Sequence, residues 1–339
     1  MSYLDDLLND LRNRTEASDA PLAEARVRLQ TVRTASGSFP GSLRTYRSGS
    51  LATHLMNDPI TDGDGGLVLD RRKFPALGPE GGGAVPSDVT DELCAYIGPK
   101  IRQTYPNARV YRSKRGPKVH FGEEVEGQDP TVDLVVALTR RDGSGLWIPN
   151  LQKDTWEPSD PEAHARILRE GLVGFRRTRR QITRLMKTWN AQFFTPGVSS
   201  FELAVWAWEF VTPGLGLAKG LWMIFDSAAT RLEADEPTPD PAGVSADLKL
   251  VGGVSVAAMA SRLRKAADNM RAAIDASADD DVLAALALVF PKHFDAPASS
   301  ALRSSMKLLA TGAPVAAAVL GVGVAASTNP LRRAYGADR

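Results

Sequence analysis

Apolar side chains recur at helical spacing near the start of the chain, at Leu4, Leu7, Leu8 and Leu11. Positions i, i+3, i+4 and i+7 form one stripe of an amphipathic helix, and Ser2 stands where a capping residue is expected. We therefore predict a helix over about residues 2–12. A second stretch of helical spacing predicts another helix from about Pro21 to Thr34.

The pattern then changes to short runs of β-branched and aromatic residues separated by turn residues. Such runs predict strands, and they occupy residues 44–51, 65–70, 108–113, 118–121 and 131–138. Residues 75–86, rich in glycine and proline, predict a flexible loop, and residues 88–105 return to helical spacing. A turn is expected at residues 142–145.

From Pro161 the pattern is helical, over residues 162–193 and then 199–211, and a break rich in proline and aspartate lies at residues 235–243. Two more helices are expected after it, at about 254–276 and 280–290. A sheet in the first half and helices in the second predict an α+β protein with a cleft between two lobes. The expected division is a core at 1–150, a helical lobe at 151–295 and an Ala/Gly-rich tail at 296–339.

Composition narrows the class of protein. The 339 residues include 41 Lys and Arg against 40 Asp and Glu, so no overall field attracts nucleic acid. The single cysteine, Cys94, excludes an intramolecular disulfide and a CxxC metal site. The acidic first residues exclude a secretory signal, so we expect a cytoplasmic protein. Residues 308–327 are long enough to cross a bilayer, but their Ala, Gly and Val content and Pro314 favour a packed tail helix, with no membrane partner expected.

Candidate chemistry is concentrated in residues 48–70. Gly49 and Ser50 lie in an expected turn, and Asp62-Gly63-Asp64 leads into a strand. Because strand side chains alternate between faces, Asp62 and Asp64 are expected on the same face. Two adjacent carboxylates repel each other unless a cation neutralises them, and such oxygen ligands suit Mg²⁺.

A third carboxylate, Asp133, lies in the expected strand at 131–138. If the two strands are neighbours, the three aspartates could hold two cations about 4 Å apart, the arrangement used for in-line phosphoryl displacement. Gly49 would then offer a backbone amide and Ser50 a hydroxyl to phosphate groups. A DxD pair or a Gly-Ser pair alone is commonly structural, but their combination at this spacing favours a functional site.

The order of Gly-Ser, spacer, DxD and a later strand aspartate resembles the polymerase-β-type nucleotidyltransferase superfamily. Further segments resemble the bacterial CD-NTases of CBASS anti-phage systems, which are relatives of cyclic GMP-AMP synthase. These segments are residues 148–164, 184–190, 199–208, 240–243 and 279–294. The resemblance covers about residues 35–295. Glycine follows each aspartate of the DxD pair, where the family often has an aliphatic residue. The start of this strand therefore carries unusually few side chains.

The resemblance implies a polymerase-β-like nucleotidyltransferase core with a helical C-terminal lobe. It implies a Mg²⁺-dependent enzyme that joins NTPs (ATP, GTP or pyrimidine NTPs) into a cyclic di- or trinucleotide messenger and releases pyrophosphate. Asp62, Asp64 and Asp133 would hold two Mg²⁺ ions, with Mn²⁺ as a substitute. Lys187 and Ser200 would contact the donor triphosphate. Partner proteins from the same operon are implied, whereas an obligatory nucleic acid is not.

Several alternatives stay open at this stage. Lys187 could lie on a solvated helix face, as is expected for most arginines of the basic run at 166–187, and Ser200 could cap the helix that follows it. The four histidines lack metal-ligand spacing and are assigned no chemistry. The enzyme could also form linear oligonucleotides or nucleotidylate tRNA or protein, or the chain could bind nucleotides without turnover.

Overall fold

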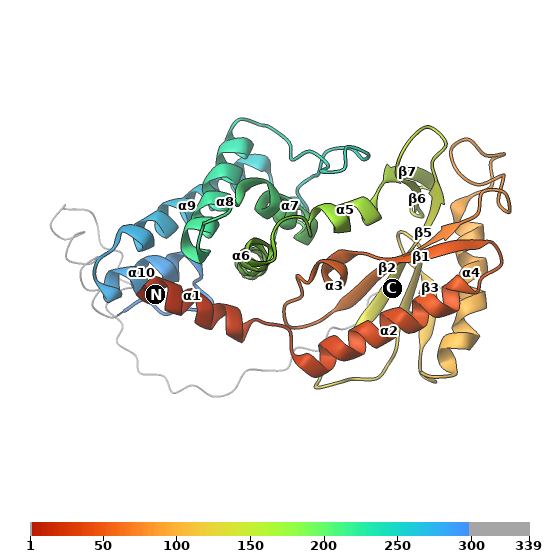
Figure 1. The fold of residues 1–339 in the computed structure, drawn as a ribbon, viewed down its shortest axis with the longest axis horizontal. Helices are drawn as coiled ribbons and strands as arrows, with labels where there is room; N and C mark the ends of the chain where they lie inside the picture. The colour runs from red at the N-terminus through yellow and green to blue at the C-terminus, as the bar shows by residue number, and fades with distance from the viewer. Residues whose placement is uncertain (1, 298–339) are drawn as a thin grey trace.

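The computed structural model describes residues 2–297 (Figure 1). Within this range, seven strands form one sheet, which occupies one half of the molecule, and helices fill the other half. The sheet half contains α2 (Asp19–Gly37), β1 (Ser42–Arg47), α3 (Gly49–Thr53), β2 (Asp62–Leu69), α4 (Pro86–Arg102), β3 (Arg109–Arg112), β4 (Pro117–His120), β5 (Thr131–Thr139), β6 (Leu146–Asn150) and β7 (Thr155–Ser159). The helical half contains α1 (Tyr3–Arg14), α5 (Pro161–Ile167), α6 (Val173–Ala191), α7 (Ser200–Phe210), α8 (Leu217–Glu233), α9 (Val256–Asp275) and α10 (Asp279–Val289).

The order of strands places β2 beside β5 in the middle of the sheet. The path is β1-β2-β5-β4-β3, with β6 paired to β5 and β7 paired to β6. β2 and β5 are parallel, and β4 runs antiparallel to β5. Odd-numbered residues of β2 and even-numbered residues of β5 face α2 and α4, where Leu67, Leu69, Val132 and Leu134 form a buried core with Leu93 and Ile97. The aspartates occupy the alternate positions and therefore lie on the opposite face.

The first helix packs into the helical half although it begins the chain. Ser2 accepts a hydrogen bond from the Asp5 amide, and the Asp5 side chain accepts one in return from the Ser2 amide, so the cap is reciprocal. Leu4, Leu8 and Leu11 are buried in the core that is built from α6 to α10. The predicted stripe of apolar residues is thus confirmed, and α1 belongs to the helical half of the molecule.

The predicted α+β fold is confirmed, but several elements differ from the sequence-based expectations. The expected strand at 44–51 ends at Arg47, and residues 49–53 form the short helix α3. The hairpin of β6 and β7 and the helix α8 were not predicted. The helical stretch after Pro161 is divided into α5 and α6 by a break at residues 168–172.

The two later helices at 254–276 and 280–290 are confirmed as α9 and α10. Across residues 2–297, none of the helices combines the length and hydropathy that a membrane crossing requires. The candidate span at 308–327 lies outside the described residues, as does the tail from residue 298 onward.

Candidate active site

Three carboxylates meet at the junction of β2 and β5. Asp64 lies in direct parallel register with Asp133, and Asp62 precedes Asp64 by two residues on the same face of β2. One carboxylate oxygen from each of Asp62, Asp64 and Asp133 lies within 4.8 Å of the others. Oxygen ligands at this separation suit a hard divalent cation, so the residues present fit a magnesium or manganese site.

The environment of Asp64 makes its charged form costly without a cation. Burial, followed by the neighbouring charges of Asp62 and Asp133, raises the pKa of Asp64 to about 7. Gly49, at the start of α3, has φ of 61° and packs directly on the Asp64 carboxylate, where any Cβ would collide with it. Glycine is therefore required at this position both by the left-handed backbone and by the close approach.

Lys118 of β4 is the nearest cation to Asp133. Its Nζ lies 2.8 Å from Oδ2 of Asp133, and the two residues are in antiparallel register. Burial alone would lower the pKa of Lys118, but the hydrogen bond that it donates to Asp133 and the charge of that carboxylate raise its pKa above the ordinary value. Sequence analysis did not identify this lysine, because only the register of β4 on β5 places it beside the aspartate.

Lys187 projects from α6 onto the Gly-Ser segment. Its Nζ donates to the backbone carbonyl of Leu55 at 2.8 Å and to Oγ of Ser50 at 3.3 Å. Burial lowers the pKa of Lys187 to about 8, with Asp62 and Asp64 opposing that shift and Arg184 adding to it. Lys187 therefore lies in the site rather than on a solvated helix face.

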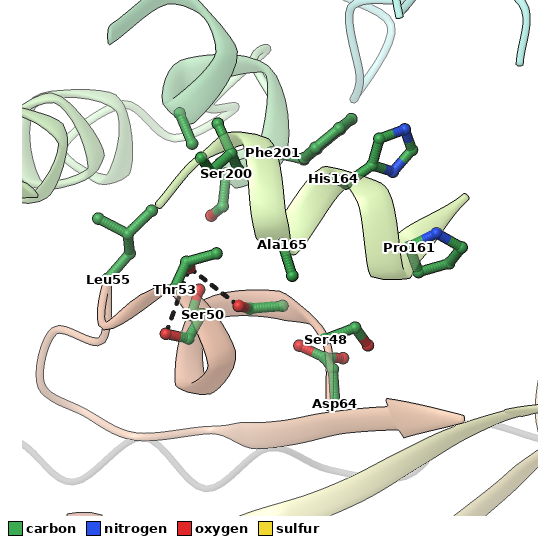
Figure 2. A pocket seen from close by; sticks show the side chains of 13 residues that line it. Ser48, Ser50, Thr53, Leu55, Asp64, Pro161, His164, Ala165, Ser200 and Phe201 are labelled. Atoms are coloured by element: carbon green, nitrogen blue, oxygen red, sulfur yellow. Dashed lines mark hydrogen bonds between the residues drawn. The ribbon is translucent and has the colours of Figure 1, made fainter. Parts of the chain in front are cut away.

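Ser200 is the first residue of α7, and it does not cap the helix. The cap is Ser199, whose Oγ accepts from the Glu202 amide at 3.1 Å. The capping alternative for Ser200 was therefore wrong, and its hydroxyl is left for other contacts. Ser200 lies across a cavity from Ser50 and Thr53 of α3 (Figure 2).

Two adjoining cavities surround this group of residues. One, of about 330 Å³, is walled by α3, by α5 and by the start of α7 (Figure 2), and includes Gly49, Ser50, Asp64 and Ser200. The other, of about 880 Å³, includes Ser50, Asp62, Asp64, Lys187 and Ser200. Asp133 and Lys118 line a further hollow on the other side of Asp64. All seven residues singled out from the sequence are thus gathered around Asp64.

His164 also lines the smaller cavity, although no chemistry was predicted for it. Its Nε2 lies 2.5 Å from Oδ1 of Asp240, and Asp240 Oδ2 accepts from the amides of Val244 and Ser245. Burial would raise the pKa of Asp240, but these amides and His164 hold it below its ordinary value. The pair fixes α5 against the loop after α8.

The glycines of the DxD strand have a steric role, because a side chain at these positions would collide with neighbouring elements. The ring of Tyr46, the register partner of Gly66, covers the place where a side chain of Gly66 would lie. A Cβ at Gly63 would press on Leu51 of α3, and one at Gly65 would press on the Tyr46 backbone. The missing side chains therefore let β1, α2 and α3 approach the strand that bears the aspartates.

The structure was compared with known proteins, and its fold matches that of several solved structures. No protein-family model and no curated protein sequence matches the chain. Among solved structures, the CD-NTase CdnG from Bradyrhizobium diazoefficiens in complex with GTP matches with a TM-score of 0.63 at 16% identity, covering 86% of this chain and 97% of that one. CdnC from E. coli MS115-1 with ATP matches with a TM-score of 0.61 at 15% identity, covering 86% and 98%.

The Vibrio cholerae cyclic AMP-GMP synthase DncV, solved with the linear intermediate pppA(3′,5′)pG, matches with a TM-score of 0.53 at 13% identity, covering 86% of this chain and 88% of that one. At these identities the similarity concerns the fold. The matches extend over both the sheet and the helices that enclose the three aspartates. The chain described here has the fold of the bacterial cGAS/DncV-like CD-NTases.

Proposed function

We propose that this protein is a nucleotidyltransferase that joins nucleoside triphosphates through phosphodiester bonds and releases pyrophosphate. We further propose that the product is a cyclic di- or trinucleotide, which serves as a messenger in anti-phage defence. The observation that carries the first proposal is the convergence of Asp62, Asp64 and Asp133 beside Ser50, Lys187 and Ser200. The second rests on the fold shared with DncV and with the cyclic dinucleotide synthase CdnE from Elizabethkingia meningoseptica.

In this proposal each residue has a stated task. Asp62, Asp64 and Asp133 hold divalent ions, which we propose to be two Mg²⁺ and for which Mn²⁺ is a substitute. When bound there, the ions supply charge neutralisation to phosphate oxygens and increase the acidity of an attacking hydroxyl. The buried carboxylate of Asp64 loses its proton when a cation compensates its charge, because its raised pKa arises from burial and from its two acidic neighbours.

Lys187, Ser50 and Ser200 bind and orient the donor triphosphate. The ammonium of Lys187 acts as a compact point charge, and it already contacts the hydroxyl of Ser50. Because Gly49 has no side chain, α3 lies directly against the carboxylate of Asp64, which brings the hydroxyl of Ser50 close to the proposed ion site. The helical lobe, proposed to span residues 151–295, supplies Lys187 and Ser200 and closes the cavity over the proposed core at residues 1–150, although α1 packs in the helical half and β7 belongs to the sheet.

The test is incubation of the purified full-length chain with labelled NTPs and Mg²⁺ or Mn²⁺. We expect pyrophosphate release and a product that resists phosphatase, as a cyclic nucleotide does and a linear one does not. The variant Asp62→Ala/Asp64→Ala should reduce turnover at least about 10³-fold, because it removes the proposed ion site. A product undiminished in this variant would contradict the proposal.

Two alternatives make different predictions in the same assay. A non-cyclising nucleotidyltransferase would release pyrophosphate and yield phosphatase-sensitive linear oligonucleotides or nucleotidylated tRNA or protein. A nucleotide-binding protein without turnover would bind NTPs and release no pyrophosphate. Mass spectrometry of the product from an equimolar mixture of four NTPs would identify its bases, and assays with purified operon proteins would test for an activating partner.

A further inference from the structure

Another hollow, separate from those of the candidate active site, lies against the other side of α3. This cavity, of about 330 Å³, is lined by Arg26 of α2, Arg47 of β1, Arg169 after α5 and His54, and we call it the arginine cavity. The residues of α3 divide between the two hollows. Gly49, Ser50 and Thr53 line the candidate active site, whereas Leu51 and Ala52 line the arginine cavity.

The positive charges of the arginine cavity lack acidic partners. Within residues 2–297, no carboxylate forms an ion pair with Arg26, Arg47 or Arg169, whereas Glu162, the acidic residue of the lining, is bound by Arg44 at 2.7 Å. Arg169 instead donates to the backbone carbonyl of Ala165 in α5. Burial and the charges of four arginines, Arg180, Arg26, Arg169 and Arg184, lower the pKa of His54.

A further cation near this hollow also has an unsatisfied group. Arg180, beside Arg169 and Arg176, has a buried Nε without a hydrogen-bond partner, and burial together with these neighbouring cations lowers its pKa. Arg26, Arg47 and Arg169 are exposed at the rim of the cavity, where their unpaired guanidinium groups are free to bind carboxylate or phosphate oxygens in a forked geometry.

We propose that the arginine cavity binds a small polyanion through its phosphate or carboxylate groups, at a site separate from the candidate active site. The size of the hollow favours a small molecule over a nucleic-acid duplex, and the chain's formal charge of +1 provides no broad attraction to a duplex. Bound there, the ligand contacts α2, β1 and the segments that carry His54 and Arg169. Its occupancy therefore orders α3 and α5, which also form the wall of the active-site cavity.

The test is a calorimetric titration of the full-length chain, freed of divalent metal on a chelating resin and without NTP, using inorganic tripolyphosphate and citrate as probes. The variant Arg26→Gln/Arg169→Gln removes two charges from the cavity. The control Arg109→Gln/Arg166→Gln removes two charges from exposed positions outside it. Lys187→Met reports on binding in the candidate active site instead, and a 20-base-pair DNA duplex is titrated as a third probe.

We expect at least one small probe to bind, with its affinity reduced about tenfold or more in the cavity variant and about twofold or less in the control and in Lys187→Met. A preference for tripolyphosphate identifies a phosphate ligand, and a preference for citrate identifies a carboxylate ligand. Saturation should also slow hydrogen exchange of residues 49–54. The proposal is overturned if no small probe binds, if the cavity variant binds it normally, or if only duplex binding is lost.

Discussion

Lys118 and Asp133 face each other across the antiparallel pair β4 and β5, with Nζ of the lysine 2.8 Å from Oδ2 of the aspartate. The ammonium neutralises one of the three carboxylates that we propose as ion ligands. A divalent ion and Lys118 therefore compete for the same negative charge. Lys118 is about 30% exposed, so it can turn toward solvent when an ion takes its place.

Replacing Lys118 should therefore strengthen binding of a divalent ion. In Lys118→Met we expect the affinity for Mn²⁺, measured by titration without nucleotide, to rise about three- to tenfold, because the ion no longer displaces a cation. The exposed Lys153→Met serves as the control and should leave the affinity unchanged. A weaker affinity in Lys118→Met would indicate that the lysine orients Asp133 for the ion rather than competing with it.

The metal-free protein should lose stability as the pH rises. The folded-state pKa of Asp64, about 7, lies above its ordinary value of 3.8, so the folded state holds the proton more tightly than the unfolded state does. Its stabilising contribution is complete below about pH 4 and is lost as the pH approaches 7. Asp64→Asn removes this loss, and we expect its melting temperature in EDTA to exceed that of the wild type by at least about 2 °C at pH 8.

The melting temperatures of Asp64→Asn and of the wild type must be compared at both low and high pH. At pH 5 the advantage of Asp64→Asn should shrink, because the wild-type carboxyl group is then protonated. Asp247→Asn, at an exposed carboxylate, should show no such pH-dependent gain. An advantage that is equal at pH 5 and pH 8 would mean that the charge of Asp64 is not its source.

Removal of the Lys187 charge should weaken NTP binding. Lys187→Met keeps the apolar stem but loses the ammonium next to Ser50. We expect the KM for NTP to rise about tenfold, the value of one charge-assisted contact, with a smaller change in kcat. Lys219→Met, on the exposed face of α8, is the control. A KM that stays within about twofold of the wild-type value would contradict the assignment of Lys187 to the triphosphate site.

Gly49 provides a test of geometry without any change of charge. In Gly49→Ala, the new methyl group collides with the carboxylate of Asp64 in addition to straining a backbone of positive φ. Gly127→Ala is a matched control, because Gly127 has φ of 74° and open space around it. In both variants the left-handed backbone should lower the free energy of unfolding by about 1 kcal/mol. Only Gly49→Ala should also lose at least about 100-fold in turnover.

The convergence of the three aspartates was predictable because it depends on the most regular property of strands. Alternation places Asp62 and Asp64 on one face, and Asp133 needs only a neighbouring strand in register to join them. The start of α1 and the extents of α9 and α10 were predictable for a similar reason, since their apolar spacing is uninterrupted, whereas α1 continues two residues beyond the predicted end at residue 12.

Features set by long-range packing were not predictable. The hairpin of β6 and β7 contains Pro149 and Pro158, which obscure a strand pattern, yet it forms at the edge of β5. Gly49–Thr53 continues a strand-like run in sequence, but it becomes a helix that packs on Asp64 and under α5. Ser199 and Ser200 are equivalent as capping residues in the sequence, and only the backbone decides between them.

The glycines between and after the aspartates of β2 have a consequence for mutational surveys of this chain. A saturation library over residues 62–66 will find nearly every position intolerant, as if all five took part in chemistry. Measuring the yield of soluble protein together with its activity will distinguish loss of chemistry from loss of folding. Substitutions at Asp62 and Asp64 should leave abundant but inactive protein, whereas those at Gly66 should deplete the protein itself, because the aromatic ring of Tyr46 already fills that space.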